Sequence, residues 1–303
     1  MEGLMALPST AGHRGVHPDP GDQETRIVTT ATPRLARVGA LLRSLRPSAS
    51  RGWGREALIF TAAYLVYQLC RTVATGAEPL AVENAHRVLG AEAALGIDIE
   101  AAAQSALDGT IWLTAFSWIY LAAQPVVIPL VVVWVYRRSA PVYRVLRNTL
   151  IAGWMVALPV YALFPTAPPR LAGVGMPDSV SIESGIALES DFTTLFYNPF
   201  AAVPSLHCGF AFACGLAVAA AARGRALRVA GLVWGPLVSV STVVTANHYV
   251  IDLGAGLAVT AAGLAIGLAV MRLQARPAIS PMRPARLAGR LVSSSIATGG
   301  RSS

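Results

Sequence analysis

The sequence predicts an all-α, polytopic membrane protein in which six transmembrane helices form one bundle. Of its 303 residues, 54% are hydrophobic and only 13% are charged, whereas roughly a quarter are charged in an ordinary soluble domain. The apolar residues also lie in nearly uncharged runs of about 20 residues or more, the length of helix that crosses a bilayer. Together these observations exclude a disordered chain, a coiled coil and a typical water-soluble enzyme.

Five apolar runs supply the six spans. Four of them have the length of single spans: residues 57–77, 109–136, 148–169 and 203–222. The run 229–271 is about twice the length of a span and contains one charged residue, Asp252, so we expect it to form a hairpin of two helices. Pro125 and Pro129 lie inside the second run and predict a kink there.

The arginines orient these spans in the membrane. All 24 basic residues are Arg. Most of them fall in four segments that the order of the spans places on one side: the tail before residue 57, residues 137–147, residues 223–228 and the tail after residue 271. Because basic loops stay in the cytoplasm, both termini are predicted to be cytoplasmic.

The loops on the opposite side are acidic. Their acids fall in two groups: Glu78, Glu83, Glu92, Asp98, Glu100 and Asp108, and then Asp178, Glu183, Glu189 and Asp191. In the first loop, residues 79–107 interleave acids with apolar residues, which predicts short amphipathic helices on the outer surface.

Three regions follow from this topology. Residues 1–55 are predicted to be a disordered cytoplasmic tail, except between Pro33 and Pro47, where leucines and arginines at helical spacing fit either a basic helix on the membrane surface or a solvated tail. Residues 56–272 form the six-span domain, which carries the candidate site. Residues 273–303 are predicted to be a basic, disordered cytoplasmic tail.

Polar residues from three places are expected at one depth, the outer edge of the membrane. Arg170 directly follows the third span, and Ser205 and His207 open the fourth. The turn of the hairpin brings His248 and Asp252 to the same edge. Each residue taken alone has a structural explanation, such as pairing with a lipid headgroup. Because the ends of three different spans place these residues at the same depth in the membrane, we predict that they form a single functional site.

The residue types suit chemistry on a phosphate ester. If Asn247 caps the sixth helix, His248 and Asp252 share one face, where the carboxylate can accept the imidazole Nδ1–H and leave Nε2 as a base or nucleophile. The free N–H groups at the start of the fourth helix, together with Ser205, form an anion site. Arg170 adds a bidentate partner for phosphate.

Three segments resemble motifs of a known superfamily. The segments YNPFAAVPSLH at 197–207 and TANHYVID at 245–252 resemble the second and third motifs of the type 2 phosphatidic acid phosphatase superfamily. The segment FPTAPPR at 164–170 resembles the first motif of its inositol phosphorylceramide synthase-like (inositolphosphotransferase-like) branch. The resemblance covers about residues 57–271. It implies a six-helix bundle and a phosphohistidine mechanism.

The resemblance also implies a role for each candidate residue. His248 would be the nucleophile on phosphorus, and Asp252 would orient it. His207 would protonate the leaving oxygen. Arg170 and Ser205 would hold the phosphoryl oxygens.

Two cations of the phosphatase pattern are missing. Leu163 and Leu171 stand where that pattern has Lys and Pro, and Thr242 stands where it has Arg. A dianionic phosphate monoester requires more positive charge than a phosphodiester or a diphosphate-linked group. The departures therefore favour a phosphotransferase that passes a lipid phospho-headgroup to an alcohol, although water could intercept the same phosphohistidine.

Three functions stay open at this point. The first is a lipid phosphotransferase, and the second is a phosphatase of phosphatidate, polyprenyl phosphate or a glycolipid precursor. The third is a non-enzymatic membrane transporter or assembly factor. We expect no cofactor and no metal, because Asp252 is the only acid in the last three spans. The expected partners are membrane lipid substrates and the bilayer of the cell membrane, not nucleic acid, with the active site on the extracytoplasmic face.

Overall fold

The computed structural model describes residues 52–73, 78–194 and 198–275. Within these residues the chain is helical, and its one β contact is an isolated bridge between Thr166 and Ala201. The tail up to residue 51, which contains the segment expected to form a basic surface helix or a solvated tail, lies outside the described residues. The tail from residue 276 onwards lies outside them as well.

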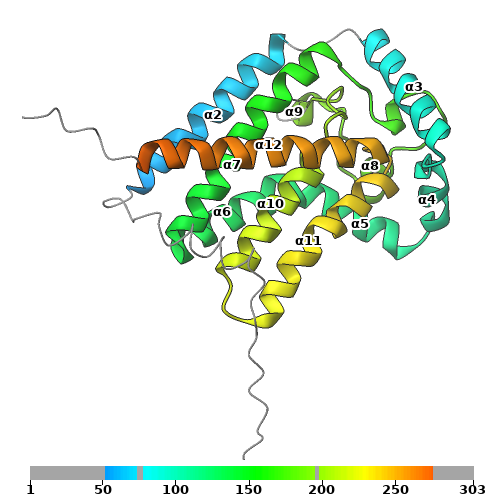
Figure 1. Ribbon diagram of the computed structural model, residues 1–303. Coiled ribbons are helices and arrows are strands. Elements are labelled where there is room, and N and C mark those ends of the chain that lie inside the picture. The colour runs from blue at the N-terminus through cyan, green and yellow to red at the C-terminus, as the bar shows by residue number, and fades with distance from the viewer. Residues whose placement is uncertain (1–51, 74–77, 195–197, 276–303) are drawn as a thin grey trace, which may run out of the picture. The chain divides into compact units, whose positions relative to one another are not determined.

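Helices α2 to α12 make up the described chain (Figure 1). The longer ones are α2 (Trp53–Val73), α3 (Glu78–Leu95), α5 (Ile111–Ala122), α6 (Ile128–Arg138), α7 (Ala140–Leu163), α10 (Leu206–Ala221), α11 (Arg225–Val244) and α12 (Val250–Ala275). The shorter elements are α4 (Glu100–Leu107), α8 (Ser179–Ser184), α9 (Asp191–Thr194), the π-helix η1 (Ala123–Val127) and the 3-10 helix η2 (Pro169–Leu171).

Four of the described helical segments are long and apolar enough to cross a membrane. They are Ile111–Arg138, which joins α5, η1 and α6, together with Ala140–Leu163, Arg225–Val244 and Val250–Gln274. Helix α10 is apolar but only 16 residues long. The prediction of an all-helical membrane protein is confirmed. The count of six spans requires α2 and α10 in addition, so it stays a prediction.

The long apolar run near the C-terminus forms the hairpin that its length predicted, with α11 and α12 as its two arms. Near Pro125, where a kink is predicted, the helix continues through the π-helical turn η1, a kind of turn at which helices bend. Proline lacks the backbone N–H and its ring clashes with the preceding turn. A π-turn accommodates both effects without ending the helix.

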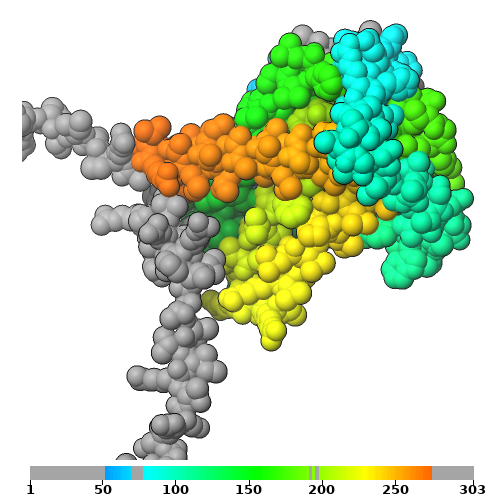
Figure 2. Space-filling view, turned by 45° about the vertical axis from the view of Figure 1, so that its right-hand side comes forward, coloured from blue at the N-terminus to red at the C-terminus, as the bar shows by residue number. Residues whose placement is uncertain are grey.

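Helices α3 and α4 form where short amphipathic helices were predicted. The buried positions of α3 recur at helical spacing: Ala81, Asn84, Ala85, Val88 and Glu92. This face turns toward the protein, and Figure 2 shows α3 (cyan) against the end of α12 (orange). The last of these positions is an acid, although the sequence suggested a surface role for the acids of this segment.

Glycines allow α12 and α10 to approach closely. Helix α12 packs on α7 and α10 (Figure 1). A Cβ added at Gly256 would lie 2.0 Å from the carbonyl oxygen of Ser205, and one added at Gly209 would lie 2.5 Å from the carbonyl oxygen of Gly256. Small residues at helix contacts are typical of membrane bundles, because they bring backbones together. Here they bring the start of α10 against α12.

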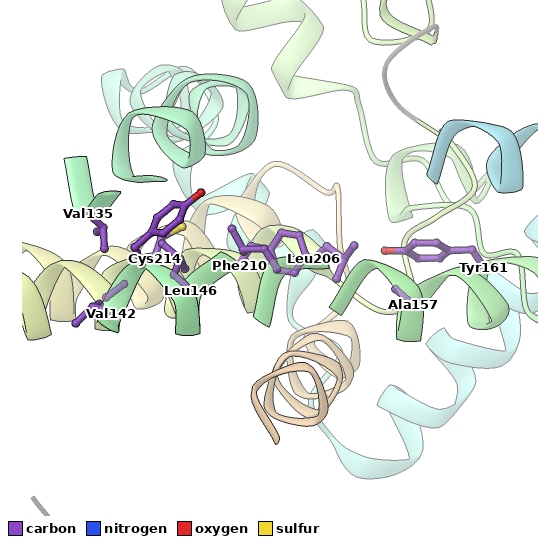
Figure 3. Close-up of a cluster of buried hydrophobic side chains, with 11 residues drawn as sticks. Val135, Val142, Leu146, Ala157, Tyr161, Leu206, Phe210 and Cys214 are labelled. Carbon is purple, nitrogen blue, oxygen red and sulfur yellow. The ribbon is translucent and has the colours of Figure 1, made fainter. Parts of the chain in front are cut away.

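The largest apolar core lies between α7 and α10. Figure 3 shows Leu206, Phe210 and Cys214 of α10 in this cluster with Ala157 and Tyr161 of α7. Phe210 and Cys214 are almost completely buried. This packing fixes α10, which begins at the candidate site.

We expect Gly256→Ala to destabilise the protein by about 1–3 kcal/mol, because the added methyl group overpacks the contact with Ser205. The thermal unfolding midpoint in detergent measures this effect. Gly254→Ala is the matched control, since a Cβ at Gly254 meets nothing within 4 Å. Equal midpoints for the two variants would contradict the close approach.

Candidate active site

A tight turn after α11 presents His248 to the site. The backbone N–H groups of Asn247 and His248 both donate to the carbonyl oxygen of Thr242, at 3.0 and 3.1 Å. Ala246 adopts a left-handed conformation with φ of 55°, which is a common way to close the C-terminus of a helix. The turn of the predicted hairpin therefore carries the histidine that was expected there.

His248 is held in one tautomer by two acceptors. Its Nδ1 lies 2.9 Å from the carbonyl oxygen of Ala202 and 3.3 Å from Oδ2 of Asp252. Since a carbonyl oxygen and a carboxylate only accept, Nδ1 carries the proton, and the neutral form of the ring has its lone pair on Nε2. The predicted pairing of His248 with Asp252 is present. The carbonyl of Ala202, which the sequence did not predict, is the closer acceptor.

His207 lies in the first turn of α10 beside His248. The centroids of the two imidazole rings are 5.6 Å apart. Tyr120 of α5 stacks on His207 with a centroid distance of 4.3 Å and an interplanar angle of 18°. Among the described residues, the ring nitrogens of His207 have no hydrogen-bond partner. They are therefore free to exchange a proton with a group bound in the pocket.

Both imidazoles line one pocket of about 130 Å³. Its wall is largely aromatic, with the side chains of Tyr64, Tyr67, Tyr120, Trp154 and Tyr161. Three amide side chains also line it: Gln124, Asn198 and Asn247. No arginine is among the described residues that line this pocket. Apart from the two imidazoles, the described lining is neutral.

Arg170 does not line this pocket, and its side chain is bound by other residues of the protein. Its Nε donates to Oδ1 of Asn247 at 2.9 Å, and its Nη1 pairs with Glu189 and, at 3.5 Å, with Asp178. The guanidinium is completely buried. The sequence predicted that Arg170 binds a phosphoryl group. In the structure its guanidinium binds acids of the loop that follows it and contacts Asn247, which lines the pocket. Its predicted contact with a phosphoryl group stays a prediction.

Ser205 connects the start of α10, which bears His207, to the start of α12, which follows His248. Its Oγ accepts from the backbone N–H of Cys208 at 3.3 Å and thereby caps α10. Its backbone N–H donates to the carbonyl oxygen of Asp252 at 3.2 Å. Ser205 is fully buried and is not among the residues that line the pocket. Its observed contacts are those of a helix cap, and its predicted contact with a phosphoryl oxygen stays a prediction.

The two positions that lack the cations of the phosphatase pattern contribute no charge to the pocket. Leu163 at the end of α7 is 83% exposed. Thr242 is fully buried, and its hydroxyl donates to the carbonyl oxygen of Ser239 at 2.8 Å. Neither position places a polar group among the lining residues.

Two acids cap the N-terminus of α12, a role that the sequence suggested for Asn247. The backbone N–H of Val250 donates to Glu100 at 2.9 Å, and that of Ile251 donates to Glu92 at 2.8 Å. Both acids are at most 1% exposed. A carboxyl group at a helix N-terminus satisfies free N–H groups and complements the helix dipole. The apolar face of α3, on which Glu92 falls, was the one signal of this role in the sequence.

Helices α3 and α4 also hold the loop that carries Arg170. Asn84 donates to the carbonyl oxygen of Pro165 at 2.8 Å, and Gln104 donates to that of Pro177 at 3.0 Å. The outer helices therefore contact both the arginine loop and the start of α12. They belong to the framework of the site.

Burial raises the pKa of Glu92 to about 8, and the neighbouring Glu100 and Asp252 act in the same direction. Glu92 is therefore protonated at neutral pH in the folded protein. In the unfolded chain it ionises near its ordinary pKa of 4.5. Between these two values the folded state binds more protons than the unfolded state, so this group lowers the stability as the pH rises from about 4.5 to about 8.

We expect Glu92→Gln to reduce the fall in stability between pH 5 and pH 8, because glutamine keeps the acceptor for Ile251 but does not titrate. Thermal unfolding midpoints at several pH values measure the effect. Glu83→Gln on the same helix is the matched control, since the Glu83 side chain is 59% exposed. A pH dependence in Glu92→Gln equal to that of the unmodified protein would contradict the assignment.

Comparison with known proteins identifies the family. A family model described as the PAP2 superfamily matches residues 86–266. This range is more than half of the chain, and it contains Arg170, Ser205, His207, His248 and Asp252. No curated protein and no solved structure matches the chain. The apolar helices and the matched range together indicate a membrane-embedded protein, and the chain belongs to the type 2 phosphatidic acid phosphatase (PAP2) superfamily.

Proposed function

We propose that this protein is a membrane phosphotransferase, similar to inositol phosphorylceramide synthase, that passes the phospho-headgroup of a lipid phosphodiester to an alcohol. Its superfamily comprises phosphatases and phosphotransferases of lipid phosphates. One observation carries the finer proposal. His207 and His248 face one pocket whose described lining holds no arginine.

The two imidazoles have complementary roles in this proposal. Nε2 of His248 attacks phosphorus, a nitrogen–phosphorus bond forms, and the bond to the leaving oxygen breaks as His207 donates a proton to that oxygen. The acceptor alcohol then gives its proton to His207 and attacks the phosphohistidine, which restores His248. Asp252 and the carbonyl of Ala202 stabilise the imidazole of His248 as positive charge develops on it.

The charge of the pocket supports a diester donor. A phosphodiester carries a single negative charge, whereas a phosphate monoester approaches two charges at neutral pH, and the second charge requires cationic partners. Leu163 and Thr242 supply none, and Arg170 is already paired with Glu189 and Asp178. Amide and hydroxyl groups can donate hydrogen bonds to a monoanion without adding charge.

The membrane setting of the reaction is part of the proposal. The arginine distribution supports cytoplasmic termini and a pocket at the extracytoplasmic face. Lipid donor and acceptor would reach the pocket from the bilayer. Neither a cofactor nor nucleic acid has a role in this scheme.

A transfer assay in proteoliposomes tests the reaction. With a phospholipid radiolabelled in its headgroup phosphate, we expect label in a new lipid and an acid-labile, labelled phospho-headgroup on Nε2 of His248. His248→Ala should abolish both. His207→Ala should lower the rate on the order of 10²- to 10⁴-fold, the usual contribution of a general acid–base group.

His86→Gln is the matched control for these variants. His86 lies on α3 outside the pocket, and glutamine retains a donor for its bond to the carbonyl oxygen of Ala172. Release of free phosphate from lipid monoesters, without any transfer, would replace the proposal with a lipid phosphatase. Activity that survives His248→Ala would contradict the phosphohistidine, and a biological role that survives it would favour a transporter or assembly factor.

A further inference from the structure

Helix α5 and its continuation through η1 carry a single amide side chain, that of Gln124. The apolar run 109–136 contains no charged residue, and Gln124 is its only Asn or Gln. Gln124 falls within the π-helical turn Ala123–Val127. π-turns inside α-helices occur frequently at functional sites, because they displace side chains from the regular helical register.

The amide of Gln124 has no hydrogen-bond partner among the described residues. Gln124 is half-buried and lines a pocket, so its amide is accessible to water or to a bound ligand. No described group of the protein competes with a ligand for these hydrogen bonds.

Gln124 lines the same pocket as His207 and His248. Tyr120 lies four residues earlier on this helix and stacks on His207 at a centroid distance of 4.3 Å. This stacking fixes the helix beside the general acid candidate. Gln124 and Tyr120 of this segment therefore line the pocket together with His207.

We propose that Gln124 is a substrate-binding residue whose side-chain N–H groups donate to a non-bridging oxygen of the phosphoryl group between His207 and His248. This inference rests on the proposed phosphotransfer at that pocket. A neutral amide stabilises the phosphoryl charge through hydrogen bonds in a pocket where the described lining supplies no arginine. The phosphoryl group in turn gives Gln124 the partner that it lacks.

Three variants separate this role from a structural one. Gln124→Glu preserves the shape of the side chain and adds negative charge, Gln124→Leu removes all hydrogen bonding, and Gln274→Leu at the exposed end of α12 is the matched control. For a phosphoryl ligand, kcat/KM should fall on the order of 10- to 100-fold in Gln124→Leu, as for a lost hydrogen bond to a charged group. It should fall further in Gln124→Glu at pH 8.

Stability should change in the opposite direction from activity. Gln124→Leu replaces an unpaired amide with an apolar side chain, so its thermal unfolding midpoint should equal or exceed that of the unmodified protein. A structural role for Gln124 predicts the reverse, with a lower midpoint in Gln124→Leu and near-normal activity in Gln124→Glu. That pattern would overturn the inference.

Orthovanadate binding tests the inference without turnover. Vanadate should raise the unfolding midpoint of the unmodified protein and of Gln274→Leu, and this rise should be absent in Gln124→Glu. Equal rises in all three proteins would overturn the role of Gln124. Failure of the unmodified protein to transfer or release any lipid phosphate would instead contradict the proposed function, and vanadate would still report on Gln124.

Discussion

The hydrogen bonds that fix the Nδ1 proton of His248 are the interaction on which the chemistry of this site depends. They require the carbonyl of Ala202, before α10, and the carboxylate of Asp252, in the first turn of α12, to meet one imidazole ring. The backbone bond from Ser205 to Asp252 joins the same two segments. Glycines allow α10 and α12 to approach closely. The same contact between these helices brings together the two acceptors that hold the proton on Nδ1 of His248.

Buried acids extend this arrangement beyond the transmembrane helices. Glu92 and Glu100 satisfy the first N–H groups of α12, so the outer helices α3 and α4 hold the helix that carries Asp252. Burial raises the pKa of Glu92, and the neighbouring carboxyl group of Glu100 acts in the same direction, so Glu92 stays protonated at neutral pH. The helix dipole favours negative charge at this end and offsets part of the cost of burial.

The pocket itself combines polar chemistry with a low charge. Arg170 is paired with acids from its own loop, and the side chains that line the pocket beside the histidines include aromatic rings and amides. Such a surface suits a substrate of modest charge with a large apolar part, as a lipid phosphodiester is. The amide of Gln124 fits the same account, because it lines this pocket and has no hydrogen-bond partner among the described residues, so a bound ligand can supply one.

The sequence by itself determined the features that depend on neighbouring residues. The lengths of the apolar runs predicted the helices and the hairpin, and the spacing of four residues predicted that His248 and Asp252 share a face. Only the tertiary structure decided that Ala202 is the closer acceptor for His248, that Glu92 and Glu100 rather than Asn247 cap α12, and that acids bind Arg170. These contacts join residues as far as 159 positions apart. Helical periodicity relates residues within a few turns, whereas such pairings depend on how the helices pack against one another.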